Sequence, residues 1–178
     1  IRRQEQRAAA AALGVKECVF LGRADGWVEV DRALRLELAR TIRRVRPEVV
    51  VTHSPERNYR FVYLYHPDHL ATGAAALAAV YPDARNPFAH LELAAEGLEA
   101  WSVDEVWVMT AGGGAANRYV DVTDTFERKL AALKAHVSQT AHMEDLEGML
   151  RTWLSVNAVQ AGYGEDRLAE SFRVVNTA

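Results

Sequence analysis

The sequence predicts an α/β fold in which helices cover a mostly parallel β-sheet in three layers. Short apolar runs typical of strands alternate with amphipathic helical patterns over the first two thirds of the chain, which is the order of βαβ units. The run Val49-Val50-Val51 is β-branched throughout, as expected for a strand buried on both faces. No repeat or linker divides the 178 residues, so we expect a single domain over residues 1–178.

The predicted helices are bounded by capping residues. Arg2 to Leu13 consists of strong helix formers and ends at Gly14, a ready C-terminal cap. Asp31 is a candidate N-cap for a helix that runs to Arg46 and stops at Pro47. Pro67 is favoured at a first helical position and begins a helix that continues to Val80. Two later helices are expected at Thr123 to Thr140 and Glu144 to Val159.

The predicted strands are short and are bounded by turn signals. The strand from Glu48 to His53 contains the β-branched run. The others are Glu17 to Leu21, Glu105 to Met109, Tyr119 to Val122 and Ser171 to Val175. Ligands of open α/β sheets collect outside the carboxyl ends of the strands, so the loop after Val51 is a favoured place for a site.

Composition excludes several classes of protein. The formal net charge is -3, which does not favour binding to nucleic acid or to an anionic membrane. Cys18 is the only cysteine, so an internal disulfide and a thiolate metal cluster are excluded, and a reducing, cytoplasmic compartment fits. The longest apolar stretch, Ala74 to Tyr81, is far shorter than the roughly 20 residues that span a bilayer.

The motif His66-Pro67-Asp68-His69 follows the favoured loop directly. If Pro67 starts a helix, His66 lies near the N-cap and His69 lies on the same face of the first turn. The positive end of the helix dipole disfavours imidazolium, so these rings stay neutral and able to bind a metal. Free N–H groups at this end would also stabilise an oxyanion.

Metal binding is not the only interpretation of this motif. Two histidines three residues apart often arise by chance. A catalytic zinc normally needs three protein ligands and an open position, and the motif supplies at most two. Asp68 offers a carboxylate that could fix the tautomer of an imidazole.

Several stretches resemble the LmbE-like, or PIG-L-type, N-acetylglucosaminyl deacetylases. The segment RRVRPEVVVT at residues 43–52 precedes a variable loop and then HPDHLATG at residues 66–73. LGVKECVFLG at residues 13–22 is followed by Asp25-Gly26. Late in the chain the resemblance continues in NRYVDVTDTFERKLAALKAHVSQ at residues 117–139 and AESF at residues 169–172. These landmarks cover nearly the whole chain, in the family's order.

The resemblance implies a Rossmann-like fold and a mononuclear zinc site that removes an N-acetyl group from a glucosamine-containing small molecule. It makes His69 a zinc ligand. His66 would stabilise the oxyanion or protonate the leaving amine, and Asp68 would orient His66. Arg2 and Glu5 match the spacing of an Arg-x-x-Glu pattern, which makes Arg2 a substrate contact. Bound zinc would lower the pKa of its water towards about 7 and polarise the acetyl carbonyl.

The sequence departs from the family pattern at its start. Family members open with a strand that ends in His-Pro-Asp-Asp, which supplies the other two zinc ligands and the carboxylate base. Here His-Pro occurs only at His66-Pro67. We therefore expect the N-terminal strand, helix and second strand to be missing. The start at Ile1, inside a helical pattern, favours truncation.

Further residues are candidates with open alternatives. Asp25 either reaches a sugar hydroxyl or is an ordinary turn aspartate. Tyr65 directly precedes the motif and either contacts the reacting group or simply packs. His53 either faces the site or is a polar residue at a strand end. The loops Asn58 to Tyr65 and Ala84 to Leu98 are predicted to select among substrates.

The sequence therefore predicts a cytoplasmic zinc hydrolase that acts on a small amino-sugar conjugate. Neither nucleic acid nor a membrane is expected as a partner, and a homo-oligomer is left open. One alternative is a non-catalytic relic of the fold that serves as a binding or assembly subunit, motivated by the missing ligands. Another is an amidase that acts on a non-sugar acyl amine.

Overall fold

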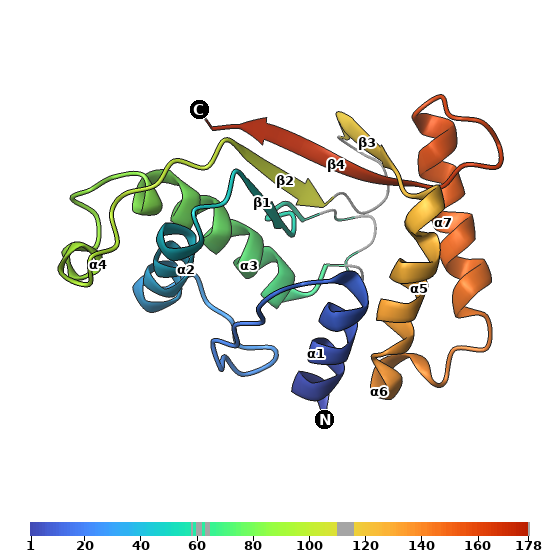
Figure 1. Cartoon of the computed structure of the whole chain (residues 1–178), viewed down its shortest axis with the longest axis horizontal. Coiled ribbons are helices and arrows are strands. Elements are labelled where there is room, and N and C mark those ends of the chain that lie inside the picture. Colours follow the sequence, from blue (N-terminus) through green and yellow to red (C-terminus); the bar gives the residue numbers. More distant parts are fainter. Residues whose placement is uncertain (58, 60–61, 63–64, 110–115, 178) are drawn as a thin grey trace. The chain divides into compact units, whose positions relative to one another are not determined.

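The chain divides into two compact units in a computed structural model that describes residues 1–57, 59, 62, 65–109 and 116–177. Unit 1 comprises Ile1–Phe20 and Tyr119–Ser171, and unit 2 comprises Leu21–Arg118 and Phe172–Ala178. The four strands form one sheet in the order β1-β2-β4-β3 (Figure 1). Within the described ranges, no helix is both long and apolar enough to cross a membrane. The single domain expected from the sequence stays a prediction.

Unit 2 contains the β-branched strand and the helix that the motif begins. Its elements are α2 (Arg32–Val45), β1 (Val49–Thr52), α3 (Pro67–Ala78), a π-helical turn (Ala79–Ala84), α4 (Leu91–Ala95) and β2 (Glu105–Met109). The capping predictions are confirmed here. Asp31 accepts a hydrogen bond from the backbone N–H of Leu34 at 2.6 Å, and Pro67 is the first residue of α3.

The sheet is mixed, and the α/β class is confirmed. β1 and β2 run parallel, in a register from Val49 opposite Glu105 to Thr52 opposite Val108. β2 runs antiparallel to β4 (Ala169–Asn176), and β3 (Arg118–Asp121) is the neighbour of β4. The carboxyl end of β1 therefore lies beside that of β2, in the parallel part of the sheet.

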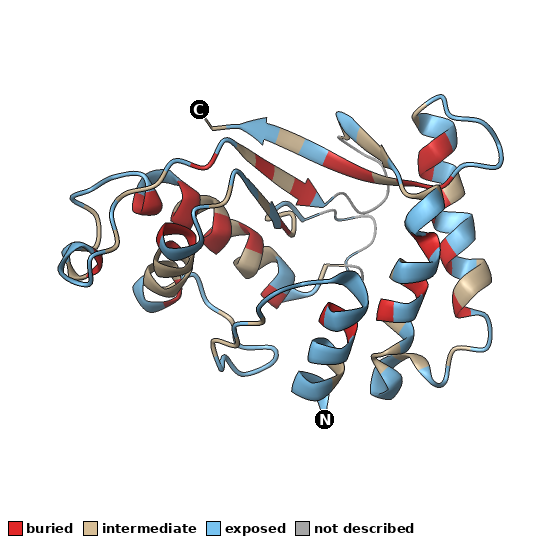
Figure 2. Ribbon diagram, in the orientation of Figure 1, coloured by how far each residue is buried: buried red, intermediate tan, exposed pale blue. Residues whose placement is uncertain are grey.

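One face of β1 and β2 is covered by α2 and α3. Val106 and Val108 are buried there together with residues of both α2 and the turn after α3, including Ala39, Ile42, Ala79 and Val80. Figure 2 shows buried residues along α3 and β2. On the opposite face of β1, Val49 and Val51 are 39% and 55% exposed. The prediction that this strand is buried on both faces is therefore wrong, because the side chains on its second face remain exposed. Unit 2 thus supplies β1, β2 and one helical layer of the predicted three.

The segment that follows α3 is held by arginines of α2. Arg43 is 3% exposed, and its guanidinium donates to the backbone carbonyls of Asp83, Ala84, Asn86, Ala89 and Leu98. Arg35 pairs with Asp83 through two contacts of 2.8 and 2.7 Å. Buried carbonyls need donors, so these arginines fix the path of residues 83–98.

Unit 1 is built from helices. Its elements are α1 (Arg2–Leu13), a 3-10 turn (Thr123–Thr125), α5 (Phe126–Lys134), α6 (Val137–Thr140) and α7 (Leu146–Gln160). α1 ends at Gly14, which has a φ of 75° as a left-handed cap requires. The core lies between α5 and α7, where Phe126, Leu130, Leu146, Leu150, Leu154 and Leu168 are buried.

Two elements differ from the prediction. Residues 17–21 are not a strand, so that prediction is wrong. An extended segment needs a neighbouring strand for its N–H and C=O groups, and none among the described residues pairs with it. The single helix predicted from Thr123 to Thr140 is interrupted after Lys134. The chain turns there and restarts as α6, where the Glu5 carboxylate accepts from the N–H and hydroxyl of Ser138.

Candidate active site

The candidate site is centred on His66, the residue directly before α3. His66 is the N-cap, and its Nδ1 accepts a hydrogen bond from the N–H of Asp68 at 3.2 Å. A ring nitrogen that accepts carries no proton, so this contact favours the neutral tautomer with hydrogen on Nε2. Because the side chain is 46% exposed, Nε2–H can donate to a bound molecule. The helix start thus prepares His66 as a hydrogen-bond donor.

Asp68 anchors a loop from elsewhere in unit 2. Its Oδ2 accepts from the N–H of Gly26 at 2.7 Å, and its Oδ1 accepts from the N–H of Val28 at 3.1 Å. Burial by itself raises the pKa of the Asp68 carboxyl, but these two N–H groups and the nearby histidines together hold the pKa below its ordinary value of 3.8. The carboxylate therefore stays charged and holds the loop.

Asp68 contacts His66 through its backbone N–H and not, as had been predicted, through its carboxylate. The His66 Nδ1 and the Asp68 Oδ2 are 3.9 Å apart, too far for a hydrogen bond. In this structure Asp68 acts on the loop through its side chain and on His66 through its backbone N–H. The anchored loop brings Asp25 to the site, where ligand atoms of Asp25, His66 and Asp68 lie within 4.8 Å of one another.

Three imidazoles gather at this end of α3. The rings of His53 and His69 are stacked, with centroids 4.1 Å apart and planes at 6°. The rings of His66 and His69 are tilted, with centroids 5.5 Å apart. Burial, and secondarily the positive charge of His69, lower the pKa of His53 below its ordinary value of 6.5. A His53 ring with a lowered pKa is neutral at neutral pH and keeps a lone pair for a hydrogen bond or a metal.

The cluster depends on a close approach at Gly73. A β-carbon on Gly73 would lie 2.3 Å from the carbonyl oxygen of His53 and 2.9 Å from the backbone of Ser54 and Pro55. Gly73 is one helical turn beyond His69. The segment leaving β1 therefore crosses α3 in backbone contact, and this crossing brings His53 onto His69. Sequence reasoning had left the orientation of His53 open.

The other predicted contacts are placed as follows. Tyr65 is half-buried and directly precedes the N-cap. Arg2 belongs to α1 in unit 1, so its contact with substrate stays a prediction. Of the loop 58–65, residues 58, 60, 61, 63 and 64 lie outside the described residues. The segment 84–98 follows the C-terminal end of α3 (Figure 1), and its role in substrate selection stays a prediction.

The donor chemistry fits a divalent metal such as zinc, which binds imidazole nitrogen and carboxylate oxygen. In the group of Asp25, His66 and Asp68, however, two members already serve other contacts. Nδ1 of His66 caps α3, and both oxygens of Asp68 accept from backbone N–H groups. No hydrogen bond to the ring of His69 is found among the described residues, and His69 is exposed. His69 is therefore the ring best able to give a nitrogen to a metal.

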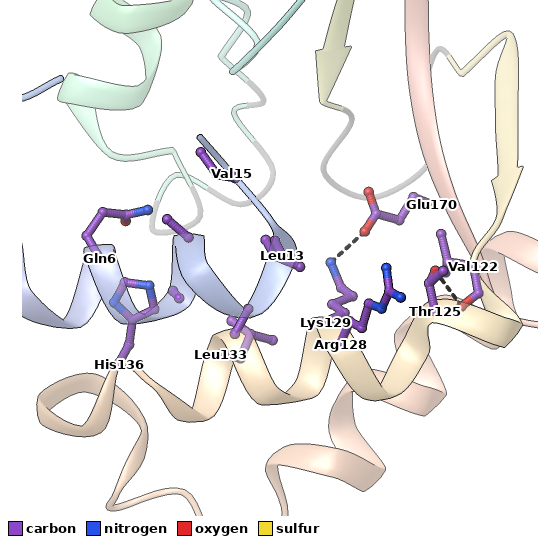
Figure 3. A pocket seen from close by; sticks show the side chains of 13 residues that line it. Gln6, Leu13, Val15, Val122, Thr125, Arg128, Lys129, Leu133, His136 and Glu170 are labelled. Atoms are coloured by element: carbon purple, nitrogen blue, oxygen red, sulfur yellow. Dashed lines mark hydrogen bonds and ion pairs between the residues drawn. The ribbon is translucent and has the colours of Figure 1, made fainter. Parts of the chain in front are cut away.

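Unit 1 contains a cavity that is lined by none of the predicted site residues. It has a volume of about 490 Å³ and lies between α1 and α5 (Figure 3). Small and aliphatic side chains such as Ala9, Ala10 and Leu133 line it. Lys129 also lines it, but its ammonium is paired with Glu170 at 2.6 Å. None of the predicted site residues lines this cavity.

Comparison with known proteins first defines the class. The fold is shared with the N,N'-diacetylchitobiose deacetylase of Pyrococcus horikoshii, with a TM-score of 0.85, 29% identity, and coverage of 99% of this chain and 63% of that chain. A conserved protein from Thermus thermophilus, TT1542, gives a TM-score of 0.74 at 25% identity, with coverage of 99% and 74%. This chain is thus an α/β protein of the deacetylase fold with a histidine-rich site.

Sequence comparison then gives the family. Residues 1–80 match the family described as PIG-L, GlcNAc-PI de-N-acetylase. A diacetylchitobiose deacetylase of Thermococcus kodakarensis is 31% identical over 98% of this chain and 62% of its own length. A 1D-myo-inositol 2-acetamido-2-deoxy-alpha-D-glucopyranoside deacetylase of Nakamurella multipartita is 34% identical, with coverage of 78% and 58%. The chain belongs to the PIG-L, or LmbE-like, family and spans about three fifths of these relatives.

Proposed function

We propose that this protein is a zinc-dependent hydrolase that removes the N-acetyl group from an N-acetylglucosamine-containing small molecule. The observation that carries the proposal is the gathering of His53, His66 and His69 at the start of α3. Relatives named for diacetylchitobiose and for an N-acetylglucosaminyl inositol support the substrate class. Their shared chemical feature is an acetamido group on glucosamine.

The chain's own residues would act on the two sides of the scissile amide. His69 would hold the metal through a ring nitrogen. Bound zinc supplies a polarised carbonyl and a water of lowered pKa. His66 would donate a hydrogen bond from its Nε2–H to the carbonyl oxygen as negative charge develops there. In its other predicted role, His66 would start as an imidazolium, give one proton to the departing amine, and regain it from the attacking water. Asp25, held in place through Asp68, would contact a sugar hydroxyl.

Acetate release tests the proposal. The protein, loaded with zinc, is incubated with N,N'-diacetylchitobiose and with N-acetylglucosaminyl inositol, and free acetate and free amine are measured. We expect equal amounts of both products, because hydrolysis breaks one C–N bond for each acetate released. If no acetate were released from any N-acetylglucosamine conjugate offered, the proposal would be wrong. An N-acyl amine without a sugar, included in the same assay, tests the amidase alternative.

A non-catalytic binding or assembly subunit is the second candidate. It is favoured by the contacts of the candidate ligands, because Nδ1 of His66 and both carboxylate oxygens of Asp68 already accept from backbone N–H groups. Metal analysis separates the two candidates. About one tightly bound zinc per chain would exclude the relic, whereas a protein that takes up no zinc and releases no acetate would support it.

A further inference from the structure

The stacked pair of His53 and His69 joins two elements that are separate in the sequence. His53 directly follows β1, and His69 lies on the first turn of α3. With planes at 6° and centroids 4.1 Å apart, the rings touch face to face. In this arrangement the ring edges, which carry the nitrogens, are not directed at each other. The contact therefore fixes the plane of the His69 ring while its nitrogens remain available.

The backbone makes this contact close. The strand-end segment crosses α3 at Gly73, with only 2.3 Å between the His53 carbonyl oxygen and the place of a β-carbon. The backbone of His53 therefore lies directly against the helix. His69 is one turn away on the same face. The side chain of His69, which is exposed, would otherwise be free to change rotamer. His53 thus covers one face of the His69 ring, whose other ring contact among the described residues is the tilted one with His66.

We propose that His53 is a positioning residue that holds the ring of His69 in the plane needed for metal ligation. The role in ligation rests on the proposed function, whereas the stacking does not. The proposal assigns the effect to the flat face of His53 and not to its nitrogens. An aromatic ring without nitrogens should therefore replace His53, and an aliphatic side chain should not.

The test compares His53→Leu and His53→Phe in the full chain, with His142→Leu as the matched control. His142 is an exposed histidine of unit 1. In the metal-free protein, the ring protons of His69 are followed by NMR. We expect an upfield ring-current shift in the wild type, in His53→Phe and in His142→Leu, and its loss in His53→Leu.

Zinc affinity is then measured by competition with a chelator. We expect His53→Leu to bind zinc about tenfold more weakly, as is common when a supporting residue of a ligand is removed. His53→Phe and the control should stay close to the wild type. Equal losses in Phe and Leu would overturn the proposal, because the nitrogens would then matter. Unchanged affinity in Leu would also overturn it.

Failure of the proposed function gives a different result. Suppose that the wild type binds no zinc but shows the ring-current shift, and that His53→Leu abolishes the shift. The proposed zinc dependence is then wrong, whereas the positioning of the His69 ring by His53 is confirmed. If the shift is absent in the wild type, the positioning is wrong whatever the metal result.

Discussion

The two ends of α3 use polar side chains in opposite ways. At the C-terminal end, Asp83 and Arg43 are each 3% exposed, and both are satisfied by other groups of the protein. At the N-terminal end, His66 and His69 are exposed and keep ring nitrogens for other partners. A buried polar group stabilises a fold only when it is fully paired. Paired, buried groups thus stabilise one end of the helix, whereas the other end presents exposed ring nitrogens for the proposed function.

The largest expected effect is at the N-terminal end. His69→Ala removes the proposed metal ligand, which would forfeit several kcal/mol of transition-state stabilisation and lower kcat/KM on the order of a thousandfold. The free energy of unfolding should change by no more than about 0.5 kcal/mol, because the ring is exposed. Acetate release and urea unfolding measure the two quantities. A variant that kept zinc and activity would remove His69 from the site.

The opposite pattern is expected at the C-terminal end. Arg43→Met leaves buried carbonyls of the segment 83–98 without a donor, so we expect a loss of roughly 3 kcal/mol in the free energy of unfolding. The kcat/KM of the folded fraction should stay unchanged. Arg128→Met, at an exposed arginine of α5, is the control for loss of a charge. If Arg43→Met lowered activity without lowering stability, the division between the two ends would be wrong.

Gly73→Ala tests the crossing that links β1 to α3. Its β-carbon would meet backbone atoms that cannot move alone, so we expect a loss of about 1–3 kcal/mol together with weaker zinc binding. Gly148→Ala in α7 is the matched control. There the β-carbon would meet the Asp145 carboxylate at 2.1 Å, a side chain that can rotate. Loss of that N-cap and the higher helix propensity of alanine should nearly cancel. Equal losses in the two variants would contradict the backbone explanation.

The smallest effect is a dependence of stability on pH at the C-terminal end. Burial by itself raises the pKa of Asp83, but hydrogen bonding and charge from Arg35, and then His90, outweigh it and hold the pKa below 3.8. A depressed pKa in the folded state gives stability that is complete above the unfolded value and is lost as the pH falls through the folded pKa. Between pH 7 and pH 3, Tm should therefore fall less in Asp83→Asn than in the wild type.

Local features of the site followed from the sequence, because they depend on neighbouring residues. Pro67 starts the helix and His66 caps it, as the motif predicted. The contacts of Asp68 with Gly26 and Val28 join residues 42 and 40 positions apart, and no local pattern reports them. The stacking of His53 required knowledge of the crossing at Gly73. The position of His53 at the end of a predicted parallel strand was the one available signal.

The strand predicted at residues 17–21 shows the limit of apolar patterning. Val19 and Phe20 are residue types that favour strands. In the structure, however, the Phe20 ring is covered by the guanidinium groups of Arg3 and Arg7 and not by a neighbouring strand. A strand needs a partner for its backbone groups. Composition records the tendency to pair, but it does not record whether a partner is present.

The carboxylate of Asp68 also bears on the entropy of the proposed substrate binding. By holding the N–H groups of Gly26 and Val28, it orders the loop that carries Asp25 when the chain folds. The conformational entropy of that loop is then lost on folding, and it would not have to be lost again when the proposed ligand binds. The loop is preorganised, so the contacts it makes with a ligand are expected to appear largely undiminished in the affinity.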